Sequence, residues 1–125
     1  MSFLKKIVIG GLFILLISSA VSANEYRCGW LENPSPSNFW LTDNMGTWYI
    51  SMQGGYHLKD RYFNRLPRIN TNEYVRTNGN YGYSCVCLNV KTDKRKHQIT
   101  KIYKKGKSLL LKRCLEDPKL SFPGK

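Results

Sequence analysis

Four cysteines are the residues whose type and spacing carry the clearest chemistry in this chain. Cys28, Cys85, Cys87 and Cys114 form an even set, which in an exported protein is typical of disulfides. Cys85 and Cys87 lie two positions apart on a predicted strand, so both side chains point to one face and a bridge between them is disfavoured. We expect two disulfides, pairing either 28 with 85 and 87 with 114, or 28 with 87 and 85 with 114. Loop entropy is nearly equal for the two pairings and does not choose between them.

A zinc site is the other chemistry open to these thiols. Cys85, Cys87 and Cys114 together with His97 would supply four possible ligands. Structural zinc sites usually bring their ligands in pairs separated by about two to four residues, whereas a single residue separates Cys85 from Cys87. An oxidising compartment also competes for the thiols. We therefore predict disulfides, with no metal and no cofactor.

His57 is the histidine best placed for catalytic chemistry. It precedes Asp60 by three positions, and a His–Asp pair can act as a general base when a nucleophile lies within reach. The sequence signals no such nucleophile, and a catalytic site needs several convergent groups. The other carboxylates, Glu32, Asp43 and Glu73 among them, are scattered through predicted turns. We predict no catalytic residues and disfavour a small hydrolase.

Residues 1–23 have the order of a cleavable secretory signal peptide. Two lysines precede an uncharged apolar stretch at residues 7–21, which is shorter than the roughly 20 residues that a transmembrane helix needs. Residues 21–23 are small and suit signal peptidase, so we predict cleavage after Ala23 and a periplasmic or secreted product. Removing 23 residues from 125 leaves 102. That length suits a single small domain at residues 24–125 with no transmembrane segment.

Positive charge is concentrated in the C-terminal third. The chain has 20 lysines and arginines against 8 acidic residues, a formal charge of +12, and residues 91–113 hold ten of these cations against Asp93 alone. Such a set can hold lipopolysaccharide phosphate, phospholipid headgroups or an acidic protein, or it can keep an edge hairpin from pairing with neighbours. Nucleic acid is disfavoured, because export separates the protein from most of it and no nucleic-acid-binding motif accompanies the charge. The candidate anion-binding residues are Lys91, Lys94, Arg95, Lys96, Lys101, Lys104, Lys105, Lys107, Lys112 and Arg113.

The rest of the predicted domain is nearly neutral and rich in aromatic residues. Trp30 and Trp48 stand at alternating strand positions, so we assign them to the core. Aromatic residues that point to the opposite face of a strand, or that lie in loops, could instead form a surface patch that stacks on a partner. The candidate partner-binding residues are Trp40, Tyr49, Tyr56 and Tyr62.

Short segments of period-two patterning, bounded by Gly, Pro, Asn and Asp, predict a small all-β fold of antiparallel hairpins in a compact sheet or sandwich. The proline-rich residues 33–37 should end the first strand, because proline cannot donate to a ladder. Residues 56–77 show no sustained period and predict a long irregular middle loop that has room for a short strand near residues 73–76, and loops of this length are often functional. Residues 109–115 fit a buried strand or a helical turn, and Pro118 and Pro123 mark a loose tail. The expected strands, stapled by two disulfides, are 26–31, 39–42, 47–52, 84–91 and 98–104.

Several short blocks along the chain resemble one family of bacterial proteins. They are Arg27-Cys28-Gly29-Trp30, Asn33-Pro34, Gly46-Thr47-Trp48, Gln53-Gly54-Gly55-Tyr56, Asn78-Gly79-Asn80-Tyr81-Gly82-Tyr83-Ser84-Cys85-Val86-Cys87 and Arg113-Cys114. The blocks occur in order over nearly the whole mature chain and include all four cysteines. The chain thus resembles the small exported bacterial proteins of the domain of unknown function 4087 family. The resemblance implies an envelope protein of Gram-negative bacteria and transfers no catalytic or binding residue.

These features favour binding over catalysis. Our first hypothesis is a protein-binding envelope factor, such as an inhibitor or immunity-type protein, that uses the middle loop and the aromatic patch. The second is a binder of polyanions or membrane surfaces that uses residues 91–113. The predicted partner is accordingly another protein or an anionic component of the envelope.

Overall fold

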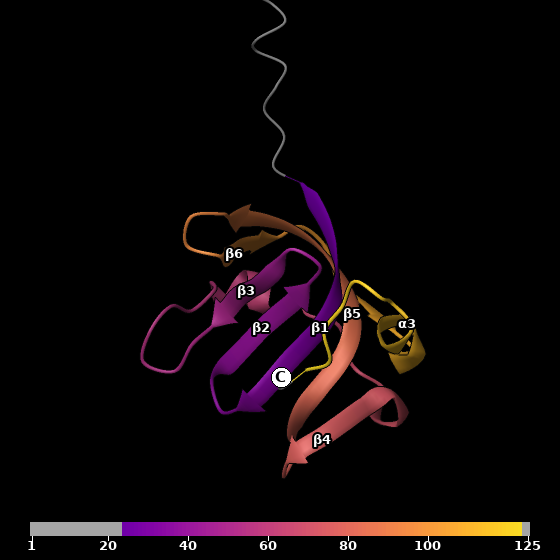
Figure 1. The fold of residues 1–125 in the computed structure, drawn as a ribbon. Helices are drawn as coiled ribbons and strands as arrows, with labels where there is room; N and C mark the ends of the chain where they lie inside the picture. Colours follow the sequence, from indigo (N-terminus) through magenta and orange to yellow (C-terminus); the bar gives the residue numbers. More distant parts are fainter. Residues whose placement is uncertain (1–23, 124–125) are drawn as a thin grey trace, which may run out of the picture.

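The structure is a computed structural model that describes residues 24–123. The predicted signal peptide, residues 1–23, lies outside the described residues. None of the helices in the described part is long and apolar enough to cross a membrane. Figure 1 shows strongly curved strands with short helices at their margins. In chain order the elements are β1 (Glu25–Ser35), β2 (Asn38–Asp43), β3 (Gly46–Ser51), α2 (Asp60–Phe63), η1 (Thr71–Glu73), β4 (Tyr74–Asn78), β5 (Tyr81–Asp93), β6 (Gln98–Ile102), β7 (Lys107–Leu109) and α3 (Leu111–Leu115).

Five of the strands close on themselves. β1 pairs with β2, β2 with β3, and β5 with β6, all antiparallel, and β3 meets β6 in a parallel contact between Tyr49 and Gln98. β1 also pairs with β5, so the path β1-β2-β3-β6-β5-β1 is a closed barrel. This strand order, with a parallel contact between the third and last barrel strands, is that of the five-stranded OB-fold. The predicted all-β class with two disulfides is confirmed, and the hairpins form a barrel rather than a sandwich.

β5 is the central strand on which the others assemble. One of its edges pairs with β1 over residues 82–90, and the other pairs in turn with β4, β7 and β6. Its side chains alternate as predicted, with one set pointing into the barrel and the two cysteines pointing out. The barrel core consists of Leu31, Leu41, Trp48, Ile50, Leu58, Val86, Leu88, Val90, Ile99 and Ile102. A second cluster outside the barrel wall contains Trp30, Cys85 and Cys114.

Two glycines permit close approach between neighbouring strands. A Cβ on Gly29 would collide with the carbonyl oxygen of Thr42, and a Cβ on Gly82 would collide with that of Val75. No larger residue fits at either position unless a strand moves, which is the usual reason for glycine inside a strand. Both glycines belong to the sequence blocks that carry the family resemblance. At these two positions, close packing between strands explains why the block contains glycine.

The prediction that the proline-rich segment ends the first strand is wrong. β1 continues through Pro34 to Ser35. The β1–β2 ladder is irregular between Glu32 and Ser35, and the β1–β5 ladder stops at Asn33. Pro34 is therefore in neither ladder, and its missing N–H leaves no strand hydrogen bond unmade. The chain reverses afterwards, at residues 36–37.

The C-terminal segment is also better ordered than the sequence suggests. Of the two alternatives for residues 109–115 the helical turn is found, since α3 covers Leu111–Leu115 and only Leu109 belongs to the short strand β7, which is not buried. The expected loose tail packs back on the second cluster through Leu120. The Phe122 ring lies 6.2 Å from that of Trp30, so large apolar side chains hold this tail despite its prolines.

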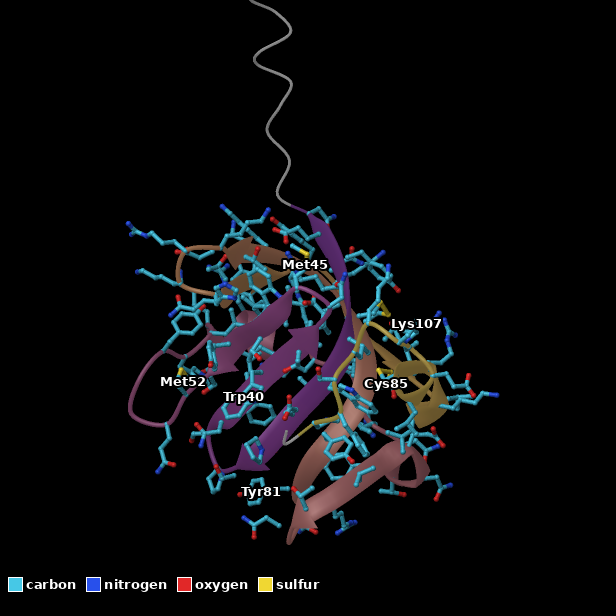
Figure 2. All side chains as sticks on the ribbon, in the orientation of Figure 1. Trp40, Met45, Met52, Tyr81, Cys85 and Lys107 are labelled. Carbon is cyan, nitrogen blue, oxygen red and sulfur yellow. A yellow bond between two sulfur atoms is a disulfide. The ribbon has the colours of Figure 1, made fainter. Side chains whose placement is uncertain are left out.

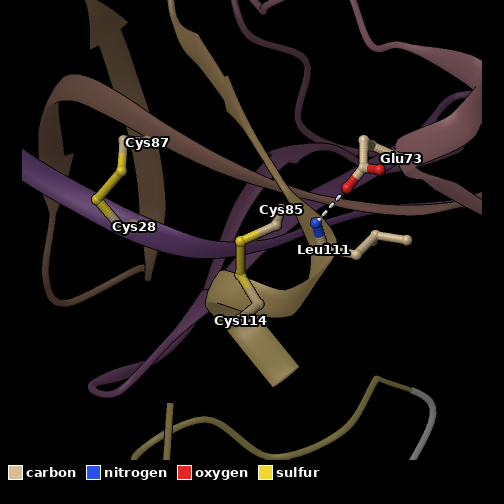
Figure 3. Close-up of a disulfide and its surroundings, with 6 residues drawn as sticks. All are labelled: Cys28, Glu73, Cys85, Cys87, Leu111 and Cys114. Carbon is tan, nitrogen blue, oxygen red and sulfur yellow. Dashed lines mark hydrogen bonds between the residues drawn. A yellow bond between two sulfur atoms is a disulfide. The ribbon is translucent and has the colours of Figure 1, made fainter. Parts of the chain in front are cut away.

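The disulfides pair Cys28 with Cys87 and Cys85 with Cys114 (Figure 3). The β1–β5 register explains the choice, because it places Cys28 directly opposite Cys87 and Trp30 opposite Cys85. Cys85 is then left for the cysteine of α3. All four thiols are consumed in these bonds, so none of them is a metal ligand.

Replacing Cys85 and Cys114 with alanine should free α3 while the barrel stays closed. This disulfide spans 29 residues, for which the chain-entropy relation gives about 3.5 kcal/mol. We expect urea titrations to show a loss of that size in the free energy of unfolding, and amide hydrogen exchange in α3 to accelerate. The control replaces Cys28 and Cys87, whose bridge lies in the barrel wall, and should not selectively expose α3. Exchange in α3 that is equally fast in both variants would contradict this assignment.

Candidate functional site

The outer face of β2 and β3 carries an aromatic pair that belongs to neither core. Trp40 lies opposite Tyr49 in the register, and the two rings meet edge to face with centroids 5.7 Å apart. Their neighbours Leu41 and Trp48 point into the barrel, so the pair faces outward, as Figure 2 shows for Trp40. Neither ring packs against a hydrophobic cluster of the described residues, which leaves aromatic surface available to a partner.

The other two aromatic candidates, Tyr56 and Tyr62, lie elsewhere and do not join this pair. Both pack against the barrel core. The Tyr56 hydroxyl donates a hydrogen bond to the carbonyl oxygen of Ile99 at 2.7 Å, and burial, with a smaller effect of the Asp93 charge, raises its pKa. The predicted four-residue patch is therefore reduced to the pair on β2 and β3, because core packing occupies the other two rings.

The turn between β5 and β6 brings positive charge to the edge of the aromatic pair. Tyr49 pairs with Gln98 at the start of β6, and its N–H donates to the carbonyl oxygen of His97 at 2.7 Å. Three cations at residues 94–96 come immediately before this contact. The Asp93 carboxylate accepts hydrogen bonds from two backbone N–H groups of the turn, both at 3.1 Å. It shapes the turn and does not neutralise its cations.

All ten candidate cations are exposed, and none forms an ion pair with a carboxylate of the described residues. Lys91 and Lys101 stand directly opposite each other on β5 and β6, and like charges so placed destabilise a sheet. We call the cations on this hairpin the hairpin group: Lys91, Lys94, Arg95, Lys96 and Lys101.

A second set of cations lies around β7 and α3, and Figure 2 shows its member Lys107 at a distance from Trp40. Lys107, Arg113 and the middle-loop residue Arg68 line a depression of about 410 Å³. Glu73 also lines it, but its carboxylate accepts a hydrogen bond from the N–H of Leu111 at 2.7 Å (Figure 3). Lys104 and Lys105 lie on the connection between the two sets and Lys112 on α3.

A serine, a histidine and an aspartate lie in line beside α2. The Ser51 hydroxyl is 2.9 Å from His57 Nδ1, and His57 Nε2 is 3.2 Å from Asp60 Oδ1. In a hydrolytic triad the serine gives its proton to the histidine. Here the Ser51 hydroxyl donates to the carbonyl oxygen of Ser37 at 2.7 Å, so its one proton is directed to the backbone and not to His57. The arrangement joins β3 to the β1–β2 turn.

Sequence reasoning missed Ser51 because its face was assigned wrongly. Strict alternation along the expected strand 47–52, with Trp48 in the core, predicts Met52 inside and Ser51 outside, yet Ser51 is 1% exposed and Met52 is 40% exposed. The β2–β3 ladder shifts register between Phe39 and Trp40, and such an irregularity turns the following residues.

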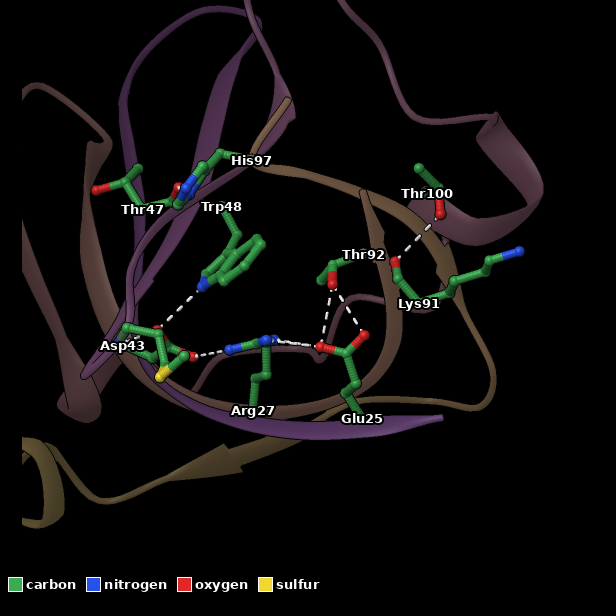
Figure 4. Close-up of polar contacts among 10 residues, drawn as sticks. Glu25, Arg27, Asp43, Thr47, Trp48, Lys91, Thr92, His97 and Thr100 are labelled. Atoms are coloured by element: carbon green, nitrogen blue, oxygen red, sulfur yellow. Dashed lines mark hydrogen bonds and ion pairs between the residues drawn. The ribbon is translucent and has the colours of Figure 1, made fainter. Parts of the chain in front are cut away.

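A partly buried ionic cluster holds the basic turn against the barrel (Figure 4). Arg27 pairs with Glu25 at 2.6 Å and Asp43 at 2.8 Å, and its guanidinium carbon lies 4.0 Å from the centre of the Trp48 ring. The indole N–H donates to Asp43 at 3.0 Å. His97 stacks on the indole with ring centroids 4.7 Å apart, so the end of the basic turn is fixed beside β3. The charge of Arg27 is neutralised within the cluster and is not available to a ligand.

The acidic end of this cluster has a perturbed pKa. Burial alone would raise the pKa of Glu25, but hydrogen bonds from Thr92 and Arg27 and the Arg27 charge lower it below its ordinary 4.5. Burial likewise opposes the charge on Arg27, whereas Asp43 and Glu25 raise its pKa. The ionised forms are therefore the ones that the folded barrel favours.

One of the comparisons with known proteins identifies a family. The sequence model of the family described as "Protein of unknown function (DUF4087)" matches residues 22–121. The chain belongs to this family. No curated protein and no solved structure matches the chain. The DUF4087 match spans the barrel, both disulfides and all ten candidate cations, so the family resemblance read from the sequence blocks is confirmed.

Replacing Glu25 with glutamine should reduce the acid sensitivity of this DUF4087 barrel. A carboxylate whose folded pKa lies below its unfolded value contributes stability above the unfolded pKa, and the contribution is lost as pH falls through the folded pKa. We expect the variant to be less stable than the wild type at neutral pH and the difference to shrink below about pH 4.5. Urea titrations across the acid range measure this. The exposed residue Glu116 is the control site, and a Glu25→Gln difference that does not change with pH would contradict the assignment.

Proposed function

We propose that the protein is exported and binds an extended anionic ligand of the cell envelope along the outer face of β2, β3 and β6. The position of Trp40 and Tyr49 beside the unpaired hairpin group carries the proposal. The two rings are half-buried and face outward, and an aromatic surface of this kind can stack on sugar rings or other flat groups. The adjacent cations would neutralise phosphates or carboxylates of the same ligand.

The barrel connectivity supports this choice of face. In OB-folds, oligonucleotides and oligosaccharides lie on the face of the second and third strands, between the loop joining the first two strands and the loop joining the last two. β2 and β3 are the second and third barrel strands here, and the basic turn joins the last two, β5 and β6. The analogy is one of fold, so it bears on where a ligand lies and not on its identity.

The compartment narrows the ligand class. Two disulfides are consistent with an exported protein, and the signal peptide predicted to end at Ala23 directs the chain to the periplasm or beyond. Nucleic acid is scarce there, whereas envelopes are rich in lipopolysaccharide phosphates and anionic headgroups. An anionic glycan or glycolipid offers both the rings and the charges that this face would recognise.

Binding to heparin, used as a model anionic glycan, should weaken by about tenfold or more when salt rises from about 50 to 300 mM, because screening shortens the reach of charge. Replacing Lys91 and Lys101 together with glutamine should weaken binding further without lowering stability, since their mutual repulsion is removed. The control removes the same charge from Lys112 and Lys119, away from the hairpin group. Absence of binding at low salt, or equal weakening by both double variants, would count against the proposal.

A protein partner is the second candidate, favoured by two exposed methionines at the ends of β3. Met45 is 62% exposed and Met52 is 40% exposed, and methionine-rich surfaces are frequent where proteins bind partners. Together with Trp40 and Tyr49 they would form an apolar strip for an inhibitor- or immunity-type contact.

Photocrosslinking distinguishes the two candidates. A crosslinking amino acid in place of Tyr49 should capture a defined envelope polypeptide that persists at high salt if the ligand is a protein, because apolar contacts are not screened. If the ligand is a polyanion, capture should be salt-sensitive and heparin should compete. The same crosslinker in place of Lys119 is the control for capture by proximity alone.

A further inference from the structure

A row of side chains crosses five strands on the outer face of the barrel. The ladders place Tyr83 of β5 opposite Glu32 of β1, and Glu32 opposite Trp40 of β2. Trp40 in turn lies opposite Tyr49 of β3, which meets Gln98 of β6. Directly opposed residues of a sheet point to the same face, so these five side chains form one row, and all five are half-buried. The outer face therefore continues past Trp40 to a carboxylate and a further aromatic ring.

The surface is hollowed at the β5 end of this row. The hollow has a volume of about 150 Å³, close to that of a cavity that holds one benzene ring. Its walls include Glu32, Pro34, Tyr83 and Pro123, and Glu32 is the only charged residue among the described residues that line it. The hollow thus offers one carboxylate between largely apolar walls.

The Glu32 carboxylate is held in place but not neutralised. Its Oε2 accepts a hydrogen bond from the Thr42 hydroxyl at 2.8 Å. No cation of the described residues forms an ion pair with Glu32, and none of these residues donates a hydrogen bond to its Oε1. Burial, followed by the Glu32 charge, raises the pKa of Tyr83, which agrees with a carboxylate beside that phenol. An oxygen of Glu32 is therefore available to a ligand.

A protonated amine suits this hollow better than an acidic group does. The carboxylate would bind an amine by a charge-assisted hydrogen bond, and the rings of Tyr83 and Trp40 on either side of Glu32 favour a cation over an anion nearby. The basic turn adjoins Gln98, three strand spacings or about 14 Å from Glu32. That separation exceeds the Debye length of about 8 Å at physiological salt, so the cations of the turn repel an amine in the hollow only weakly.

We propose that the ligand of the outer face is an amino-sugar chain whose protonated amine binds at Glu32 and whose acidic group reaches the basic turn. A sugar ring next to the amine would lie over Trp40 and Tyr49. The inference rests on the proposed function for the acidic end of the ligand, and the amine site gives that ligand a direction across the sheet, from β1 to β6.

Two probes with identical sugar rings test the amine site on the predicted mature chain, residues 24–125, in slightly acidic buffer at about 0.15 M salt. A trimer of glucosamine carries protonated amines, and its fully N-acetylated form carries none. We expect NMR titrations to show the glucosamine trimer bound roughly fivefold more tightly, the factor that a partly exposed ion pair supplies. Glu32→Gln should abolish this preference, because glutamine keeps an acceptor for Thr42 and removes the charge. Glu116→Gln, at the end of α3, is the control and should retain it.

A second variant blocks the hollow from within the chain. Thr77 is exposed and lines the hollow, so Thr77→Lys supplies a competing cation and should weaken binding of the glucosamine trimer more than binding of the acetylated one. The inference is overturned if the wild type does not prefer the glucosamine trimer, if Glu32→Gln keeps the preference, or if Glu116→Gln loses it equally.

Heparin separates this inference from the proposed function. Glu32→Gln should bind heparin as tightly as the wild type or more tightly, because the variant has one negative charge fewer. Heparin binding without a preference for the glucosamine trimer overturns the amine site alone. A preference for the glucosamine trimer without heparin binding supports the amine site and overturns the proposed binding of an anionic ligand.

Discussion

The pairing of β1 with β5 is the interaction on which the rest of the structure depends. It runs through nine consecutive residue pairs, from Glu25 opposite Val90 to Asn33 opposite Gly82. It closes the barrel, places Cys28 opposite Cys87 and leaves Cys85 to reach α3. Since side chains alternate across a strand, the same register sends Leu31 of β1 and the core residues of β5 inward and all three cysteines of these two strands outward. A slip of one residue would reverse all of these assignments together.

Barrel closure also explains how a small domain leaves aromatic residues on its surface. The interior is filled by one inward-facing set from β2, β3, β5 and β6, so the alternate residues have no core to enter. Trp40 and Tyr49 are such residues, and the Arg27–Trp48–His97 stack holds the basic turn next to them. The barrel thus tolerates opposed lysines and half-buried rings that belong to no core. Departures of this kind from the most stable surface are commonest where a protein binds something.

Much of the local structure could be read from the sequence, because it follows from short-range patterns. Alternating hydrophobicity and turn residues predict the β2–β3 and β5–β6 hairpins and the central strand. The two-residue spacing of Cys85 and Cys87 predicts that they share a strand face and form disulfides with other cysteines. Pro34 and Ser51 were misassigned because both lie next to ladder irregularities, which period-two patterns do not register. The sequence leaves Tyr56 and Tyr62 open between a surface patch and the core, because a loop without periodicity gives no sign of what it packs against.

By itself the sequence determined the all-β class, the position of the charge and the presence of a disulfide framework, because residue type and spacing along one strand suffice for each. The tertiary structure alone decided which cysteines pair, that the hairpins close into a barrel, and that the basic turn lies beside Trp40 and Tyr49. It also decided that the middle loop packs on the barrel core through Tyr56 and Tyr62. Each of these depends on register between strands far apart in the chain, and such registers follow from the packing of the whole core rather than from any local pattern.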